Sequence, residues 1–153
     1  MHILLPYASL SGNTREVARM IAARCQAGGH TTRLLDVEDP QAAEAVLQPH
    51  GRLLLGSWTD NAGRTPAEMK RFVALLRNRA GLPPPDQVAV FGTGETQWGL
   101  EYYCGAAHRL ARFFGSPYPV LEIEQMPHGS AHALAIQQWT DTVLLPLETP
   151  CPC

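Results

Sequence analysis

The sequence lacks the features that would place it outside the ordinary globular proteins. Its 153 residues contain no apolar run that approaches the ~20 residues of a membrane span. The first residues, 1–6, carry no basic segment, so we expect no secretory signal peptide. Internal repeats and low-complexity stretches are also missing. With 45% hydrophobic residues, a chain of this length is expected to form one domain with a sizeable core.

An excess of charge of one sign is missing too. Twelve Lys and Arg oppose 14 Asp and Glu, which gives a net charge of −2, and charged residues make up only 17% of the chain. Lys70 is the only lysine, so nearly all the cations are arginines. This near balance argues against the basic surface that nucleic-acid-binding proteins need. We therefore expect neither nucleic acid nor a membrane as a partner.

Cysteines are few and are not spaced as a disulfide framework or a redox pair. The four are Cys25, Cys104, Cys151 and Cys153, and no two form a Cys-x-x-Cys motif. This usage favours a reducing, cytoplasmic location. His128 and His132 are four residues apart, but no Cys or carboxylate accompanies them, so we expect no metal site. Residues 149–153 are expected to form a loose tail.

The sequence does contain a regular alternation of strand and helix patterns. The expected strands cover 1–8, 31–37, 52–58, 87–91 and 120–125, and the expected helices cover 13–27, 41–47, 66–80, 101–114 and 130–145. Such alternation predicts an α/β fold with a parallel sheet covered on both faces. In the last strand, polar and apolar residues alternate, which is typical of an edge strand. Ligands of such folds bind at the carboxyl ends of the strands.

Some details of these elements can also be predicted. Asn13 and Glu16 have the spacing of a capping box at the first helix. Thr65 is expected to cap the third helix, with Pro66 in its first turn. Pro6 would cost a central strand one hydrogen bond, so we expect it near the strand's end, at a bulge.

The loop after the first strand is suited to an anion. Residues 9–14 supply three hydroxyls, a glycine and the start of a helix. Unpaired N–H groups at a helix start carry partial positive charge, and they attract phosphate without help from Lys or Arg. The loop has neither the lysine of a P-loop nor a Gly-x-Gly-x-x-Gly motif. It predicts a phosphate site, although an ordinary polar turn has the same composition.

Two segments resemble those of one known family. Ser9-Leu10-Ser11-Gly12-Asn13-Thr14 resembles the flavodoxin phosphate loop, which runs Ser/Thr-x-Ser/Thr-Gly-x-Thr after the first strand. Residues 88–106 resemble the flavodoxin segment at the fourth strand, with Phe-Gly-x-Gly, an aromatic residue and then Tyr-Cys-Gly-Ala. The order of elements matches along nearly the whole chain. The resemblance implies a short-chain flavodoxin domain over 1–148, with three layers and a five-stranded parallel sheet in the order 2-1-3-4-5.

The resemblance also implies a site for FMN. The phosphate would lie in residues 9–14, and the flat isoalloxazine ring would lie between the loops after the third and fourth strands. Trp58 and Trp98 are the candidates to stack on the ring. The cofactor-binding residues implied in this way are Ser9, Leu10, Ser11, Gly12, Asn13, Thr14, Ser57, Trp58, Thr59, Asp60, Asn61, Ala62, Gly63, Thr93, Gly94, Glu95, Trp98, Tyr103 and Cys104.

The function implied by the resemblance is that of a low-potential carrier of single electrons. FMN would supply the chemistry, and we expect no catalytic residue. The partners would be a reductase and an acceptor enzyme, met by a monomer through carboxylates near the ring edge, whereas the arginines concentrate on helices. Two alternatives stay open: an activator of a dimanganese ribonucleotide reductase, which suits the mild charge, and an FMN-dependent NAD(P)H or quinone reductase.

Overall fold

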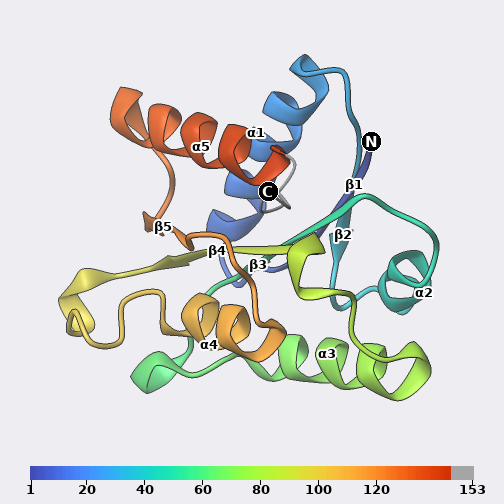
Figure 1. Cartoon of the computed structure of the whole chain (residues 1–153). Coiled ribbons are helices and arrows are strands. Elements are labelled where there is room, and N and C mark those ends of the chain that lie inside the picture. Colours follow the sequence, from blue (N-terminus) through green and yellow to red (C-terminus); the bar gives the residue numbers. More distant parts are fainter. Residues whose placement is uncertain (146–153) are drawn as a thin grey trace, which may run out of the picture.

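The protein is built around one parallel β-sheet (Figure 1). The computed structural model describes residues 1–145. Its strands are β1 (His2–Ala8), β2 (Thr31–Asp36), β3 (Arg52–Ser57), β4 (Val88–Gly94) and β5 (Leu121–Glu124). They lie in the order β2-β1-β3-β4-β5, and every neighbouring pair is parallel. The predicted fold class and strand order are therefore confirmed.

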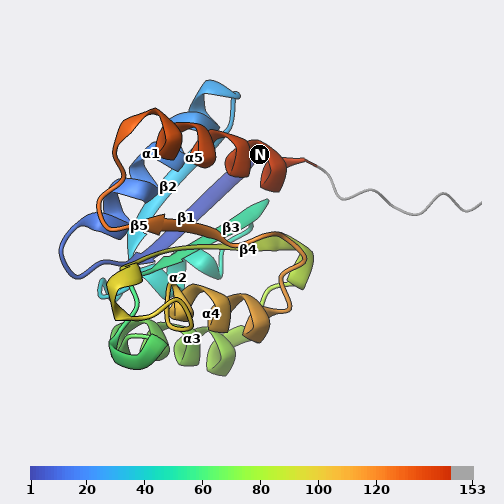
Figure 2. The same ribbon diagram turned by 90° about the vertical axis from the view of Figure 1, so that its left-hand side faces the viewer.

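Helices cover both faces of the sheet and complete three layers (Figures 1 and 2). One face carries α1 (Asn13–Ala27) and α5 (Gly129–Leu144), and the other carries α2 (Ala42–Val46), α3 (Ala67–Ala80) and α4 (Gly105–Phe114). Single turns of 3-10 helix occur at η1 (Asn61–Gly63), η2 (Pro85–Gln87) and η3 (Thr96–Trp98). Within residues 1–145, no helix is both long enough and apolar enough to cross a membrane.

Each face of the sheet has its own hydrophobic core. Leu53 and Leu55 of β3 point to the α2–α4 side, and Leu54 between them points to the α1–α5 side. All three are fully buried. Because the central strands are covered on both faces, they appear in the sequence as continuous apolar runs rather than as alternating patterns. Burying a side chain of this kind contributes about 1.5–3 kcal/mol.

Pro6 does not produce the expected bulge. It is paired with Leu35 of β2, two residues before β1 ends. On the other side, Leu4 pairs with Leu53 and Tyr7 with Gly56, so the register with β3 is the same before and after the proline. The β1–β3 ladder is interrupted only at Leu5 and Pro6. The missing N–H therefore costs a hydrogen bond towards β3 without adding a residue to the strand.

The two predicted helix caps are wrong. The residue before α1 is Gly12, with φ 93°, and no side chain accepts a bond there, so Asn13 and Glu16 do not form a capping box. Only glycine adopts such a conformation without strain. Pro66 in extended conformation, not Thr65, precedes α3. Neither helix start is capped by a side-chain hydrogen bond.

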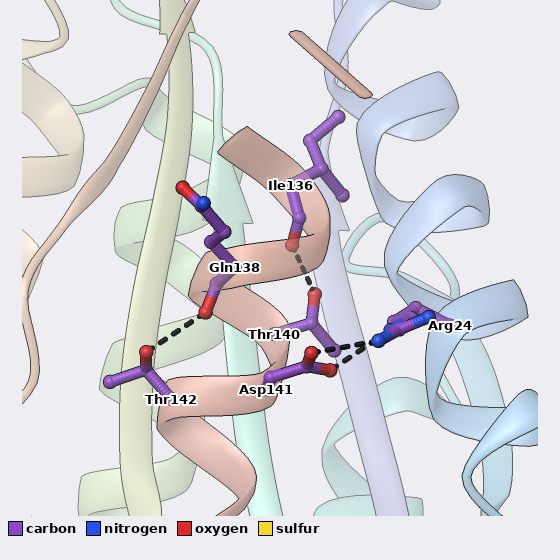
Figure 3. Close-up of polar contacts among 6 residues, drawn as sticks. All are labelled: Arg24, Ile136, Gln138, Thr140, Asp141 and Thr142. Atoms are coloured by element: carbon purple, nitrogen blue, oxygen red, sulfur yellow. Dashed lines mark hydrogen bonds and ion pairs between the residues drawn. The ribbon is translucent and has the colours of Figure 1, made fainter. Parts of the chain in front are cut away.

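Helices α1 and α5 are joined by a salt bridge on the molecular surface (Figure 3). The Arg24 guanidinium donates to both Asp141 carboxylate oxygens, over 2.9 and 2.8 Å. This contact holds the pKa of Asp141 below its ordinary value. Next to it, the buried Thr140 hydroxyl donates to the Ile136 carbonyl over 2.7 Å. The Arg24–Asp141 salt bridge thus links α1 to α5, and neither residue lines the cleft described below.

Candidate functional site

A cleft of about 520 Å³ opens at the carboxyl ends of β1, β3 and β4. This is where open parallel sheets bind ligands, and the volume lies in the range of small-molecule sites. The cleft is formed by three loops and the end of β5. The residues that line it are Leu10, Ser11, Asn13, Thr14, Trp58, Thr59, Asp60, Asn61, Ala62, Gly63, Thr93, Gly94, Glu95, Tyr102 and Gln125.

The loop between β1 and α1 is held in shape by hydrogen bonds to the Ser9 side chain. The Ser9 hydroxyl accepts the N–H groups of Gly12 and Arg15 over 3.1 and 3.3 Å. Within residues 1–145, no acceptor is recorded for the N–H groups of Asn13 and Thr14. These two groups stand at the start of the 15-residue helix α1 and carry its partial positive charge. The loop therefore offers free donors to an anion, and Ser9 acts by holding the loop in shape.

A buried hydrogen bond joins this loop to the end of β4. The hydroxyls of Thr14 and Thr93 lie 2.8 Å apart, and the two residues are 1% and 4% exposed. A buried hydroxyl without a partner costs about 1–3 kcal/mol. The pair therefore holds the start of α1 against the end of β4, two of the segments that line the cleft.

The loop after β3 is closed on itself and bound to α4. Asp60 and Arg64 form an antiparallel bridge, and the Asp60 carboxylate accepts the Asn61 N–H over 2.8 Å. Gly63, with φ 75°, lies so close to Gly105 that a Cβ on Gly105 would be 2.7 Å from the Gly63 carbonyl oxygen. The two cleft walls are thus in direct backbone contact.

Trp58 is held at both its backbone and its ring. Its N–H donates to the Ala8 carbonyl at the end of β1 over 3.2 Å. Its indole N–H donates to the Glu68 carboxylate of α3 over 2.6 Å, and both side chains are half-buried. The indole packs against the core on the α2–α4 side and lines the cleft. A flat aromatic surface is therefore fixed at one wall, as stacking on a ring requires.

The loop after β4 is supported by β5 and by the start of α4. The Glu124 carboxylate accepts both the backbone N–H and the hydroxyl of Thr96, and these bonds lower its pKa. Cys104 precedes α4 with φ 50° and is fully buried. Burial raises the pKa of the Cys104 thiol to about 12 and also raises that of Tyr103, so neither group ionises at neutral pH. Both residues support the cleft from behind.

The structure brings most of the predicted site residues together around one cleft. Of residues 9–14, all but Ser9 and Gly12 line it, and all of 58–63 and 93–95 do. The predicted residues outside the lining are Ser9, Gly12, Ser57, Tyr103 and Cys104. Ser57 is buried, and its hydroxyl donates to the Trp58 carbonyl. The side chain of Trp98, the second predicted stacking residue, lies outside what the structure describes.

Two residues that line the cleft were not predicted from the sequence, Tyr102 and Gln125. Tyr102 is 40% exposed and faces the cleft, whereas its neighbour Tyr103 packs against the core. Gln125 follows β5 with φ 56°, and its N–H donates to the Gly94 carbonyl over 2.9 Å. The position of Gln125 could have been found, because the carboxyl end of β5 adjoins that of β4. No sequence signal distinguishes Tyr102 from Tyr103.

The chemistry of the lining fits FMN. One end supplies unpaired backbone N–H groups, the hydroxyl of Ser11 and no charged side chain, which suits a phosphate. The carboxylates Asp60 and Glu95 belong to the loops after β3 and β4. These loops also supply the aromatic side chains of Trp58 and Tyr102 and the backbone of Gly63 and Gly94. Such groups suit a flat heteroaromatic ring with hydrogen-bonding edges.

Comparison with known proteins agrees with this geometry. The sequence model of the flavodoxin family matches residues 5–139. A probable flavodoxin 2 of Bacillus subtilis (strain 168) is 29% identical over 136 residues, which cover 83% of this chain and 84% of that protein. The crystal structure of oxidised flavodoxin 2 from Bacillus cereus is 29% identical, with a TM-score of 0.79 over 94% of this chain and 97% of that one. The flavodoxin of Streptococcus pneumoniae TIGR4 shares the fold, with a TM-score of 0.80 over the same shares at 19% identity. The chain therefore belongs to the flavodoxin family, whose members bind FMN and transfer electrons to redox partner proteins.

Proposed function

We propose that the cleft holds FMN with its phosphate at the start of α1 and its ring between the loops after β3 and β4. The observation that carries this proposal is the division of the lining. Free N–H groups without charged side chains lie at one end, and the fixed indole of Trp58 lies in another wall. The phosphate contacts are assigned to Ser11, Asn13 and Thr14, with Ser9 and Gly12 as supports. The ring contacts are assigned to 58–63, 93–95, Tyr102 and Gln125.

The start of α1 can be tested by adding a negative charge to it. Asn13 lies in the first turn and lines the cleft. Asn13→Asp places a carboxylate where the phosphate would lie, although a carboxylate at a helix start by itself stabilises the helix. We expect FMN binding to weaken by about tenfold or more, as one uncompensated like charge at close range would cause. Urea unfolding of the FMN-free variant should show no loss of stability.

Riboflavin, which has the same ring without the phosphate, is the control ligand. Its affinity should be the same in the wild type and in Asn13→Asp. Ser130→Asp, at the exposed start of α5, is the matched control variant and should leave FMN binding unchanged. Equal weakening of FMN and riboflavin by Asn13→Asp would place the phosphate elsewhere. Protein that stays colourless after addition of FMN would overturn the assignment of the whole site.

We also propose that the chain passes single electrons between a reductase and an acceptor enzyme, as a monomer in the cytoplasm. The buried, unpaired thiols of Cys25 and Cys104 support a reducing location. Neither the ribonucleotide reductase activator nor the NAD(P)H or quinone reductase is favoured by the comparisons.

An anaerobic redox titration of the FMN-loaded protein separates these functions. A one-electron carrier should show two well-separated reduction steps. Two overlapping steps would instead indicate two-electron or peroxide-related chemistry and would contradict the carrier.

A further inference from the structure

A second hollow of the molecule lies between α3 and α4, outside the FMN cleft. It has a volume of about 360 Å³. Its apolar lining comes from Val73, Ala74, Leu110 and Phe113, and Phe113 is 46% exposed. Figure 2 shows the two helices side by side on the face of the sheet opposite α1 and α5. We call this hollow the α3–α4 groove.

Three cations surround the groove. Lys70 and Arg77 reach it from α3, and Arg109 reaches it from α4. Within residues 1–145, none of the three has a salt-bridge partner, whereas Arg79 on α3 pairs with Glu44. The groove therefore combines an apolar floor with three exposed cations that are free to pair with carboxylates of another molecule.

The two helices that form the groove are themselves rich in basic residues. Helices α3 and α4 together carry six Lys or Arg and one carboxylate, Glu68, which is a formal charge of +5. The whole chain carries −2, so the remaining residues together carry −7. Helices α3 and α4 are therefore basic within a slightly acidic chain, and this local charge attracts an acidic partner.

We infer that the α3–α4 groove is a docking site for an acidic amphipathic segment of a redox partner protein. An apolar side chain of that segment would cover Val73 and Phe113, and its carboxylates would pair with Lys70, Arg77 and Arg109. This combination of an apolar floor and complementary charges is what an amphipathic helix in a groove requires.

The position of the groove connects docking with electron transfer. Arg109 also lines a hollow of about 490 Å³ over the start of α4, and that hollow shares Ala62, Gly63 and Tyr102 with the FMN cleft. A segment in the groove would therefore hold the rest of its protein beside the cleft. The cleft itself carries Asp60 and Glu95, of opposite sign. Two surfaces of opposite charge fix the orientation of a partner better than one. This link rests on the proposed function, whereas the docking itself does not.

The test uses the FMN-loaded protein and a synthetic peptide as the probe. The peptide has about 14 residues, with leucines on one helical face and glutamates on the other. At low salt, its NMR chemical-shift changes should be confined to α3 and α4. Lys70→Glu should weaken binding about five- to tenfold, because it reverses one charge at the groove. Arg71→Glu is the matched control, since it makes the same charge change at the next, exposed position outside the groove, and should weaken binding less than about twofold.

Several results would overturn the inference. Equal weakening by Lys70→Glu and Arg71→Glu would show attraction by the general field alone. Equally strong binding of a peptide in which glutamines replace the leucines would show that the apolar floor does not contribute to docking. Dodecanoate that displaces the peptide at a lower concentration would identify a lipid-like anion as the occupant. Self-association abolished by Lys70→Glu would identify a second copy of the chain. Peptide binding by the wild type and both variants is also measured on FMN-free protein. A protein that failed to bind FMN would therefore not prevent the test of the groove.

Discussion

The hydrogen bond between Trp58 and Glu68 should connect α3 to the wall of the FMN cleft. The indole nitrogen and the carboxylate oxygen are 2.6 Å apart. A hydrogen bond to a charged group contributes about 1.5–3 kcal/mol. Both side chains are half-buried, so solvent screens the pair, and we reduce this to about 1 kcal/mol. Glu68 is also the acidic residue in the first turn of α3, which adds about 0.3–1 kcal/mol through the helix dipole.

A double-mutant cycle separates these two contributions. Glu68→Ala removes both of them, whereas in a Trp58→Phe background it removes only the helix-dipole contribution. The two effects on the free energy of unfolding should therefore differ by about 1 kcal/mol. Urea unfolding of FMN-free protein measures this difference without interference from the cofactor. Glu16→Ala, in the first turn of α1, is the matched control and should show no coupling to Trp58→Phe.

Two further measurements follow from the same contact. The indole N–H resonance of Trp58, assigned by its loss in Trp58→Phe, should shift in Glu68→Ala. FMN affinity should fall about two- to fivefold in Glu68→Ala, because a ring that is no longer held must be ordered on binding. A coupling energy below about 0.3 kcal/mol, with an unmoved indole resonance, would refute the reasoning.

Three other perturbations test the structure around the cleft and on the far face. Thr14→Val leaves the buried Thr93 hydroxyl without its partner and should lower the free energy of unfolding in urea by about 1–3 kcal/mol. The double variant with Thr93→Val should recover part of that loss. Equal losses in the single and double variants would show that this hydrogen bond does not contribute to stability. Gly105→Ala should lower the unfolding free energy by about 1–3 kcal/mol and weaken FMN binding, because its Cβ would be 2.7 Å from a backbone oxygen. Gly28→Ala, where the nearest contact would be 3.4 Å, is the control and should be nearly neutral. Since Arg24 lowers the pKa of Asp141, their pair stabilises the fold above the ordinary value of 3.8 and loses this effect as the pH falls towards the lower, folded-state value. Asp141→Asn should therefore lower the urea midpoint at pH 7 and match the wild type in strongly acidic buffer; a difference that persisted there would contradict this assignment.

The fold could be predicted because the strand–helix alternation is a property of the sequence itself. The ends of the strands and helices were harder to predict, and Gly92 shows why. A glycine after an apolar run indicates a loop, but β4 continues to Gly94. A Cβ on Gly92 would be 2.6 Å from the Cβ of Ala107, so this glycine allows α4 to approach the sheet. That neighbour is distant in sequence, and no local pattern reveals it.

The start of α4 was misplaced for a similar reason. The expected start was Glu101, whereas the helix begins at Gly105 after Cys104 in a left-handed conformation. The first helical N–H groups are approached by another loop, because the Thr59 hydroxyl accepts the Ala106 N–H over 3.4 Å. Helix boundaries that depend on side chains from another loop can be found only once the fold has brought the loops together.

The candidate site was predictable as a set of loops but not residue by residue. That the loops after β1, β3 and β4 line one cleft could be predicted, since they follow the carboxyl ends of adjacent strands. Ser9 was assigned to the ligand, and the structure shows that its hydroxyl oxygen also accepts the N–H groups of Gly12 and Arg15. A hydroxyl in a polar loop serves the ligand or the backbone equally well as judged from the sequence.

The close contact between Gly63 and Gly105 has a consequence for engineering the protein. The loop after β3 and the start of α4, which follows the loop after β4, are separated by some forty residues of sequence, but they touch through backbone atoms. A loop taken from another protein to replace residues 58–63 must fit the first turn of α4 to better than the radius of a methyl group. The two loops therefore form one exchangeable module, and changing the properties of the cleft by loop transfer requires that both be moved together.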